Sequence, residues 1–137
     1  MKVCTATLES LTEYCQSRYH ATEKQNKEGA ADYEERTWRN KLHSDENGNV
    51  CIPPVAFKFA IDGAAKRLRM QIPGKGKSEY GKHLAGGVLV LEGITLNIKK
   101  DQVEGRRLHL NADGRRGGGK RVERIIPVIP KIGRAHV

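Results

Sequence analysis

The sequence has few aromatic residues, no long apolar run and only three cysteines. Aromatic residues make up 5% of the 137 positions. No apolar segment approaches the ~20 residues that a membrane-spanning helix needs, and we find no hydrophobic segment typical of a signal peptide. Cys4, Cys15 and Cys51 are scattered and odd in number, which is typical of reduced thiols in a reducing compartment. We therefore expect an intracellular, cytoplasmic protein without a membrane partner.

Motifs for catalysis and metal binding are also lacking. Residues 76–78, Gly-Lys-Ser, match the end of a phosphate-binding P-loop, but Gln71 stands where its first glycine is needed. We find no nucleophile elbow and no pair of carboxylates in a glycine-rich context. Four histidines lack the spacing of a zinc site, namely His20, His43, His83 and His109. We therefore expect no enzyme activity, no cofactor and no bound metal.

Positive charge is abundant and unevenly distributed. The chain has 25 Lys/Arg against 16 Asp/Glu, a net charge of +9. Residues 1–50 carry 7 against 9, a net of −2, so residues 51–137 carry 18 against 7, a net of +11. A basic half of this kind is typical of proteins that bind nucleic acid or another polyanion. The alternative is that the charge serves solubility alone.

A helix is predicted to begin at Pro54 and to continue until Pro73. Pro54 suits the first helical position, where its missing N–H has no partner to lose. The apolar residues recur at helical spacing and predict one core-facing stripe, made of Phe57, Ala60, Ile61, Ala64, Ala65 and Leu68. Lys58, Asp62, Lys66 and Arg69 are expected on a solvent-facing side. Pro73 and Gly74 are expected to stop the helix, which we predict to organise the core.

Two basic, glycine-rich loops provide the candidate binding residues. Glycine lets a backbone approach a phosphate closely, and lysine and arginine then supply hydrogen-bond donors. The first loop follows the helix and has a tyrosine for base stacking; the second surrounds a run of three glycines. A polar loop over residues 12–29 adds Arg18 and His20. The other candidates are Lys66, Arg67, Arg69, Lys75, Lys77, Tyr80, Lys82, Arg115, Arg116, Lys120 and Arg121.

The remaining elements predict an α+β fold with an antiparallel sheet and one main helix. We expect a first strand over residues 3–11 with Cys4, Ala6 and Leu8 buried. Alternation predicts a strand over residues 94–99 with Ile94 facing inward. Other strands are expected at residues 50–52, 88–91, 108–110 and 122–129, and Pro127 in the last of them indicates an edge or an end.

A second helix is predicted over residues 30–42. Its apolar positions are Ala30, Tyr33 and Thr37, followed by Trp38 and Leu42. Glu35 and Arg39 are expected to pair, because they are four residues apart. Residues 45–49 are predicted to form a turn around Asn47-Gly48.

The last six residues, IGRAHV, match the translation of a common sequencing adapter. We therefore expect residues 131–137 not to be native, and residues 1–130 to be a single domain from the N-terminal part of a longer protein.

Residues 52–66, IPPVAFKFAIDGAAK, resemble the IP-x-x-x-x-K-x-x-x-R-x-A-A segment of the RAMP superfamily, the RNA-binding subunits of CRISPR effectors. The resemblance implies a ferredoxin/RRM-like core that binds RNA. Asp62 departs from the basic residue usual in that segment, and the family's C-terminal Gly-Arg-rich loop is absent. The segments SRYH, RTWR, IPGKGK and DGRRGGGKRVE also resemble proteins of phages and prophages. This resemblance implies that the protein is located in the cytoplasm of a bacterial host.

These observations predict a non-catalytic protein that binds single-stranded RNA or DNA through its basic glycine-rich loops. A protein partner, or further copies of the chain along the nucleic-acid strand, is an additional expectation. One alternative is a protein-interaction module, such as an inhibitor or mimic of a CRISPR effector subunit. Another is a metal-independent ribonuclease of the RAMP type, with His20 or His83 as the general acid or base.

Overall fold

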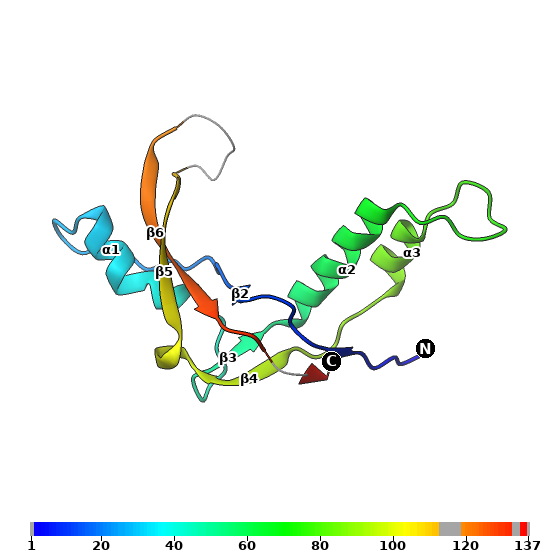
Figure 1. Cartoon of the computed structure of the whole chain (residues 1–137), viewed down its shortest axis with the longest axis horizontal. Coiled ribbons are helices and arrows are strands. Elements are labelled where there is room, and N and C mark those ends of the chain that lie inside the picture. The colour runs from blue at the N-terminus through cyan, green and yellow to red at the C-terminus, as the bar shows by residue number, and fades with distance from the viewer. Residues whose placement is uncertain (1, 113–118, 133–134, 137) are drawn as a thin grey trace. The chain divides into compact units, whose positions relative to one another are not determined.

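A computed structural model describes residues 2–112, 119–132 and 135–136 of the chain. It shows an α+β protein with antiparallel sheets and three α-helices (Figure 1). The chain forms two compact units. The first comprises Met1–Cys51 and Thr95–His136, and the second contains Ile52–Ile94. The single-domain organisation expected from the sequence stays a prediction.

The largest sheet of the described residues lies in the first unit and has the strand order β2-β6-β5. Strands β5 (Glu104–Asn111) and β6 (Arg121–Ile129) form a long antiparallel hairpin, in register from Glu104 opposite Val128 to Asn111 opposite Arg121. The short β2 (Tyr14–Cys15) pairs with the other side of β6, opposite Ile129 and Val128. The strand predicted over residues 122–129 is confirmed, and the one predicted around residue 109 is longer than expected.

Pro127 lies in the middle strand of this sheet, so the expected edge position is wrong, although β6 does end two residues later, at Ile129. Proline is tolerated there because of the direction in which its missing N–H would point, which can be read from Ile125, two residues earlier. The N–H of Ile125 points away from β5, because it donates to a side chain of the helix that packs on β6. Successive residues of a strand alternate in direction, so the missing N–H of Pro127 also faces away from β5. On that side β2 ends at Cys15, opposite Val128.

The helix predicted over residues 30–42 is α1 (Ala30–Thr37), followed by a 3₁₀ turn, η1 (Trp38–Lys41). Thr37, Trp38 and Leu42 are buried as expected, but Ala30 is exposed. The expected pair between Glu35 and Arg39 is absent: the Arg39 guanidinium lies over the Trp38 ring, and Glu35 binds an arginine of β5. Two charged residues of this segment, Glu34 and Lys41, are unexpectedly buried.

The core of the first unit joins this helical segment to the sheets. Leu42, Val50 and Ile129 are 0% exposed, and burying each stabilises the fold by roughly 1.5–3 kcal/mol. Strands β3 (Asn49–Ile52) and β4 (Ile94–Lys99) form a two-stranded sheet. Its predicted alternation is confirmed: Leu96 is buried between exposed neighbours. The turn that precedes β3 is confirmed as well, with Gly48 at φ 76°.

Helix α2 (Pro54–Leu68) begins at Pro54 as predicted, but its end is set differently. Arg69 adopts a left-handed conformation (φ 48°) and donates its N–H to Ala65 O, which closes the helix before Pro73 is reached. No residue of α2 is fully buried, and Leu68 is 66% exposed. The prediction that this helix organises the core is therefore wrong, since the buried apolar residues of the described chain lie almost entirely in the first unit.

Helix α3 (Tyr80–Gly87) was not predicted. It packs beside α2 within the second unit (Figure 1). The Lys58 ammonium, expected in solvent, donates to the carbonyls of Leu84 and Ala85 at 2.8 and 3.1 Å and to Asp62 at 2.8 Å. A cation at the last carbonyls of a helix is favourable, so Lys58 holds the end of α3 against the start of α2.

Two other expectations about strands are wrong. Residues 88–91 form no strand. The first strand shrinks to β1 (Thr7–Leu8), and Cys4, Ala6 and Leu8 are exposed because no layer of the described residues covers them. Strand β7 (Ala135–His136), in the tail expected to be non-native, pairs antiparallel with β1. Whether the tail is native stays a prediction.

Candidate nucleic-acid interface

The first basic loop is a defined turn between α2 and α3. The backbone N–H of Ile72 donates to Ser78 O at 2.8 Å, and the N–H of Tyr80 donates to Met70 O at 3.0 Å. Gly74 and Gly76 have φ angles of 73° and 61°, in the left-handed region that glycine adopts without strain. The loop expected between the helix and residue 88 is therefore a short hydrogen-bonded turn, and Tyr80 and Lys82 belong to a helix.

Six of the predicted cations gather in this helical hairpin, and all six are exposed. Arg69 binds Glu79 (Nε to Oε1, 3.3 Å). The other five cations have no carboxylate partner among the described residues; they are Lys66, Arg67, Lys75, Lys77 and Lys82. Residues 52–94 contain seven Lys/Arg and three Asp/Glu, a net charge of +4. The hairpin therefore presents unneutralised positive charge to solvent.

An open hollow of about 490 Å³ lies at the start of α3. Lys77, Lys82 and His83 line it together with Ser78 and Glu79. Tyr80 begins the same helix and is 39% exposed. The hollow combines two ammonium groups, an imidazole and a hydroxyl, which are hydrogen-bond donors suited to a phosphate. Its one carboxylate, that of Glu79, is paired with Arg69. Sequence reasoning did not place Ser78 and His83 with these lysines, because the helix that brings them together was missed.

The candidates from the N-terminal loop lie in the first unit, beside α1. Arg18 is exposed, and its backbone N–H donates to Lys41 O at 2.9 Å. The His20 ring stacks on Tyr33 with centroids 6.3 Å apart, and its Nδ1 lies 3.1 Å from Thr22 Oγ1. His20 is half-buried and contributes to the packing of this loop on α1, whereas the side chain of Arg18 is open to solvent.

The second basic loop connects β5 to β6. Lys120 and Arg121 lie at its base and are exposed, and the Ala112 N–H donates to Lys120 O at 3.0 Å. Arg115 and Arg116 fall outside the described residues. The two basic loops belong to different compact units. A single groove formed by both therefore stays a prediction.

Other arginines of the first unit are already neutralised. Arg107 binds Glu35 at 2.5 Å and Glu123 at 2.8 Å. Arg106 and Glu13 form a two-bond ion pair, 2.8 Å in each contact. These carboxylates raise the pKa of both guanidinium groups through hydrogen bonds. These ion pairs hold the strands together, and their two arginines are less available to a polyanion than the cations of the helical hairpin.

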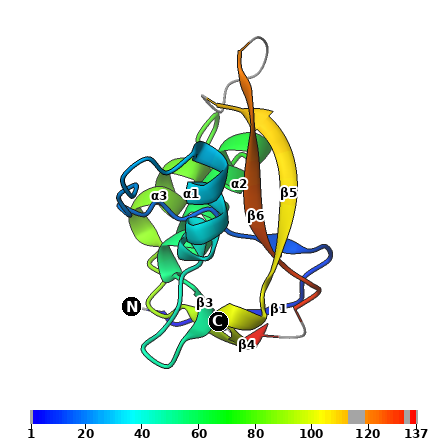
Figure 2. The same ribbon diagram turned by 90° about the vertical axis from the view of Figure 1, so that its left-hand side faces the viewer.

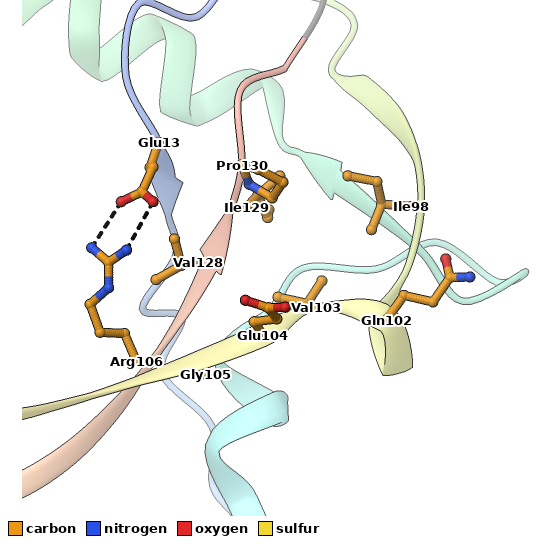
Figure 3. Close-up of a pocket in the computed structure, with 10 residues that line it drawn as sticks. All are labelled: Glu13, Ile98, Gln102, Val103, Glu104, Gly105, Arg106, Val128, Ile129 and Pro130. Atoms are coloured by element: carbon orange, nitrogen blue, oxygen red, sulfur yellow. Dashed lines mark hydrogen bonds and ion pairs between the residues drawn. The ribbon is translucent and has the colours of Figure 1, made fainter.

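A larger hollow of about 550 Å³ lies beside the start of β5 (Figure 3). Its apolar part includes Val103, Val128 and Ile129, all at most 8% exposed. The Glu13–Arg106 pair and Glu104 lie at its polar side. None of the predicted site residues lines it. Two carboxylates against one paired arginine do not suit a phosphate, so we exclude this hollow from the candidate interface.

Among the described residues there is no cluster of three or more His, Cys, Asp or Glu side chains arranged to hold a metal ion. In the same part of the chain, no helix has the length and apolar character needed to cross a bilayer. Cys4, Cys15 and Cys51 are free thiols. Burial raises the pKa of the Cys51 thiol and so favours its protonated form.

No protein-family model matches the chain. No curated protein and no solved structure is significantly similar to it either. A proposed function therefore rests on the side chains and the charges described above.

Proposed function

We propose that this chain is a non-catalytic protein that binds single-stranded nucleic acid through its sugar–phosphate backbone. The observation that carries the proposal is a group of five exposed cations in the α2–α3 hairpin that have no carboxylate partner among the described residues, Lys66, Arg67, Lys75, Lys77 and Lys82. Lysine and arginine contacts to phosphates supply sequence-independent affinity.

A single strand is favoured over a duplex because an aromatic ring adjoins the cations. Tyr80 is 39% exposed and lies in the first turn of α3, two residues before Lys82. Stacking of a base on an exposed tyrosine requires an unstacked base, which a single strand provides. Arg18, Lys120 and Arg121 are exposed cations of the first unit, and we assign them, with Arg115 and Arg116, to the same type of contact.

The finer fold prediction contributes little to this proposal. An RRM has a four-stranded sheet, whereas the largest sheet of the described residues has three strands. The resemblance to RAMP proteins and to phage proteins, and the bacterial cytoplasm that it implies, remain part of the proposal. Binding itself depends on the cations and requires neither resemblance.

The test is a salt titration of binding to mixed-sequence single-stranded DNA and RNA oligonucleotides. Replacing Lys75, Lys77 and Lys82 by glutamine should weaken binding to every sequence alike. It should also flatten the slope of log K against log salt by about 0.7 for each phosphate that the variant no longer neutralises. A matched control replaces Lys2, Lys24 and Lys27, which are exposed cations of the first unit. Equal effects of the two triple variants, or no effect of either, would contradict the proposal.

A second candidate function is protein interaction, and one observation favours it. Helix α2 exposes large apolar side chains: Val55 is 49%, Phe59 69% and Leu68 66% exposed. An apolar interface depends weakly on salt, whereas phosphate binding depends on it steeply. Replacing Phe59 by serine should leave oligonucleotide affinity unchanged if the cations bind nucleic acid.

A further inference from the structure

The two outer edges of the β5–β6 hairpin differ in how their backbone groups are hydrogen-bonded. On the β6 side, the backbone groups of Ile125 are both bonded to side chains. Its N–H donates to Glu34 Oε1 at 2.7 Å, and its carbonyl accepts from Lys41 Nζ at 2.9 Å. Side chains of α1 and η1 therefore close this edge of β6 beyond the end of β2. Figure 2 shows α1 beside β6, with β5 on the far side of β6 from α1.

The register shows which backbone groups β5 leaves open. Ile125 faces away from β5, so Arg107, which lies opposite it, belongs to a pair that exchanges no hydrogen bonds. The N–H and C=O of such a residue point away from the partner strand. By alternation, Gly105 and His109 are oriented in the same way. Outside the hairpin, the structure records no backbone hydrogen bond from these three residues to any described residue, so β5 presents an open edge.

Open strand edges of this length are templates for pairing with another strand. Strand β5 has eight residues, and its side chains are exposed along nearly all of its length. Leu108 and Leu110 are 39% and 41% exposed. The outer half of the hairpin has only two strands, because β2 pairs only with residues 128–129. Such a ribbon is marginally stable unless further strands join it.

We propose that the β5 edge pairs antiparallel with β5 of a second copy of this chain. A two-fold axis at Leu108 places Arg107 opposite His109 of the other copy. The backbone N–H and C=O of both residues point outward from the hairpin. The two-fold axis forms the Arg107–His109 pair twice, and each pair exchanges two backbone hydrogen bonds, which gives four. Leu108 then lies opposite its own copy in the close, non-hydrogen-bonded position. The result is a four-stranded β6-β5-β5-β6 sheet with a self-complementary interface.

The charges on β5 allow this pairing. Like charges directly opposite one another are unfavourable in a sheet. An axis at Leu108 avoids placing either arginine of β5 opposite itself. Arg106 is neutralised by Glu13, and Arg107 by Glu35 and Glu123, all within one chain. The open edge therefore carries little net charge, although the whole chain has a net charge of +9.

The experiment measures the molar mass of the full chain, freed of nucleic acid at high salt, over a wide concentration range. We expect a monomer–dimer equilibrium, and hydrogen exchange at Arg107 and His109 that slows as the dimer forms. His109→Pro removes an outward N–H that β5 does not use within the hairpin, and should give a monomer. His109→Ala keeps that N–H and should remain dimeric.

Leu108→Lys and Leu108→Glu test the register without a change to the backbone. Each variant alone should be monomeric, because like charges then meet at the axis, and an equimolar mixture should dimerise. Circular dichroism confirms that each variant is folded. A parent chain that stays monomeric at all concentrations would overturn the proposal and leave the edge to a strand of another protein. A dimer that persists in His109→Pro, or in each Leu108 variant alone, would overturn it equally.

Discussion

The Glu34 carboxylate accepts the backbone N–H of Ile125 through Oε1 at 2.7 Å, across 91 positions of the sequence. The same carboxylate binds the Lys41 ammonium, which in turn donates to the Ile125 carbonyl at 2.9 Å. Arg124 Nη1 lies 3.3 Å from the second carboxylate oxygen. Two charged side chains thus replace a neighbouring strand at this point of β6 and fix α1 to the sheet.

Glu34→Ala should destabilise the protein strongly, because it leaves the Lys41 charge buried without a partner and Ile125 N–H unsatisfied. Breaking a buried ion pair by removing one partner typically costs about 3–5 kcal/mol. Urea unfolding followed by tryptophan fluorescence measures the loss, since Trp38 adjoins this network in the core. Glu35→Ala, at the exposed end of the pair with Arg107, is the control and should have a much smaller effect. Equal effects would show that the Glu34 network contributes no more than a surface pair.

The stability contributed by Glu34 should also depend on pH. Burial raises the pKa of this carboxyl, but the hydrogen bonds from Lys41 and the Ile125 backbone outweigh it and hold the pKa below its usual value. A lowered pKa stabilises the fold above the unfolded-state pKa of 4.5 and loses that contribution as the pH falls through the folded-state value. Unfolding of the parent should therefore become easier on acidification below that point. Glu34→Gln should reduce this pH dependence.

Glu28 should titrate at an unusually low pH. Hydrogen bonds from Arg36, and one from the backbone of Gln25, lower its pKa from 4.5 to about 2. The stability that it contributes is present above pH 4.5 and is lost as the pH falls toward 2. Carboxyl-carbon NMR measures this pKa directly. In Arg36→Met the pKa should return toward 4.5; a pKa near 4.5 in the parent would contradict the observed ion pair.

Gly105→Ala should destabilise the first unit. A Cβ at this position would lie 2.5 Å from Ile125 Cγ2 and 3.2 Å from the Trp38 ring. Overpacking of this kind costs about 1–3 kcal/mol. Gly63→Ala is the matched control, because its Cβ meets nothing within 4 Å. In helix α2 this change should stabilise by up to about 1 kcal/mol. Thermal unfolding of both variants should show shifts of opposite sign.

Leucine-to-alanine changes should locate the core. Leu42 is 0% exposed and Leu68 is 66% exposed. Truncating a buried leucine costs about 2–5 kcal/mol, whereas the change at Leu68 removes little buried surface. We expect a large fall in unfolding free energy for Leu42→Ala alone. A comparable fall for Leu68→Ala would show that α2 carries a core-facing stripe after all.

Removal of residues 132–137 should leave the core of the first unit unchanged. Ile132 exchanges hydrogen bonds with Ser10, donating its N–H to Ser10 Oγ at 2.7 Å. Both residues of strand β1, which pairs with β7, are exposed. Deletion therefore uncovers no buried apolar side chain of β1. The thermal midpoint of the truncated chain should match that of the parent, and a fall of several degrees would assign the tail a structural role.

Part of the candidate site could be predicted from the sequence. The cations that follow α2 are contiguous in the chain, so Lys66 to Lys82 would gather wherever the helix ends. The sequence did not show that Arg69 binds Glu79, or that His83 joins Lys77 in one hollow. Both depend on α3, whose glycine-rich sequence has weak helix propensity and lacks a side-chain cap.

The sequence by itself determined the local features of this protein. Pro54 starts α2, Gly48 permits the turn before β3, and alternation orients β4, because each depends on neighbouring residues only. The tertiary structure decided what no periodicity contains. It buried Glu34 and Lys41, placed Pro127 in a middle strand and left Phe59 and Leu68 of α2 exposed. A pattern shows which face of an element is apolar, but only long-range contacts decide which surface covers that face and which backbone groups a distant side chain can bind.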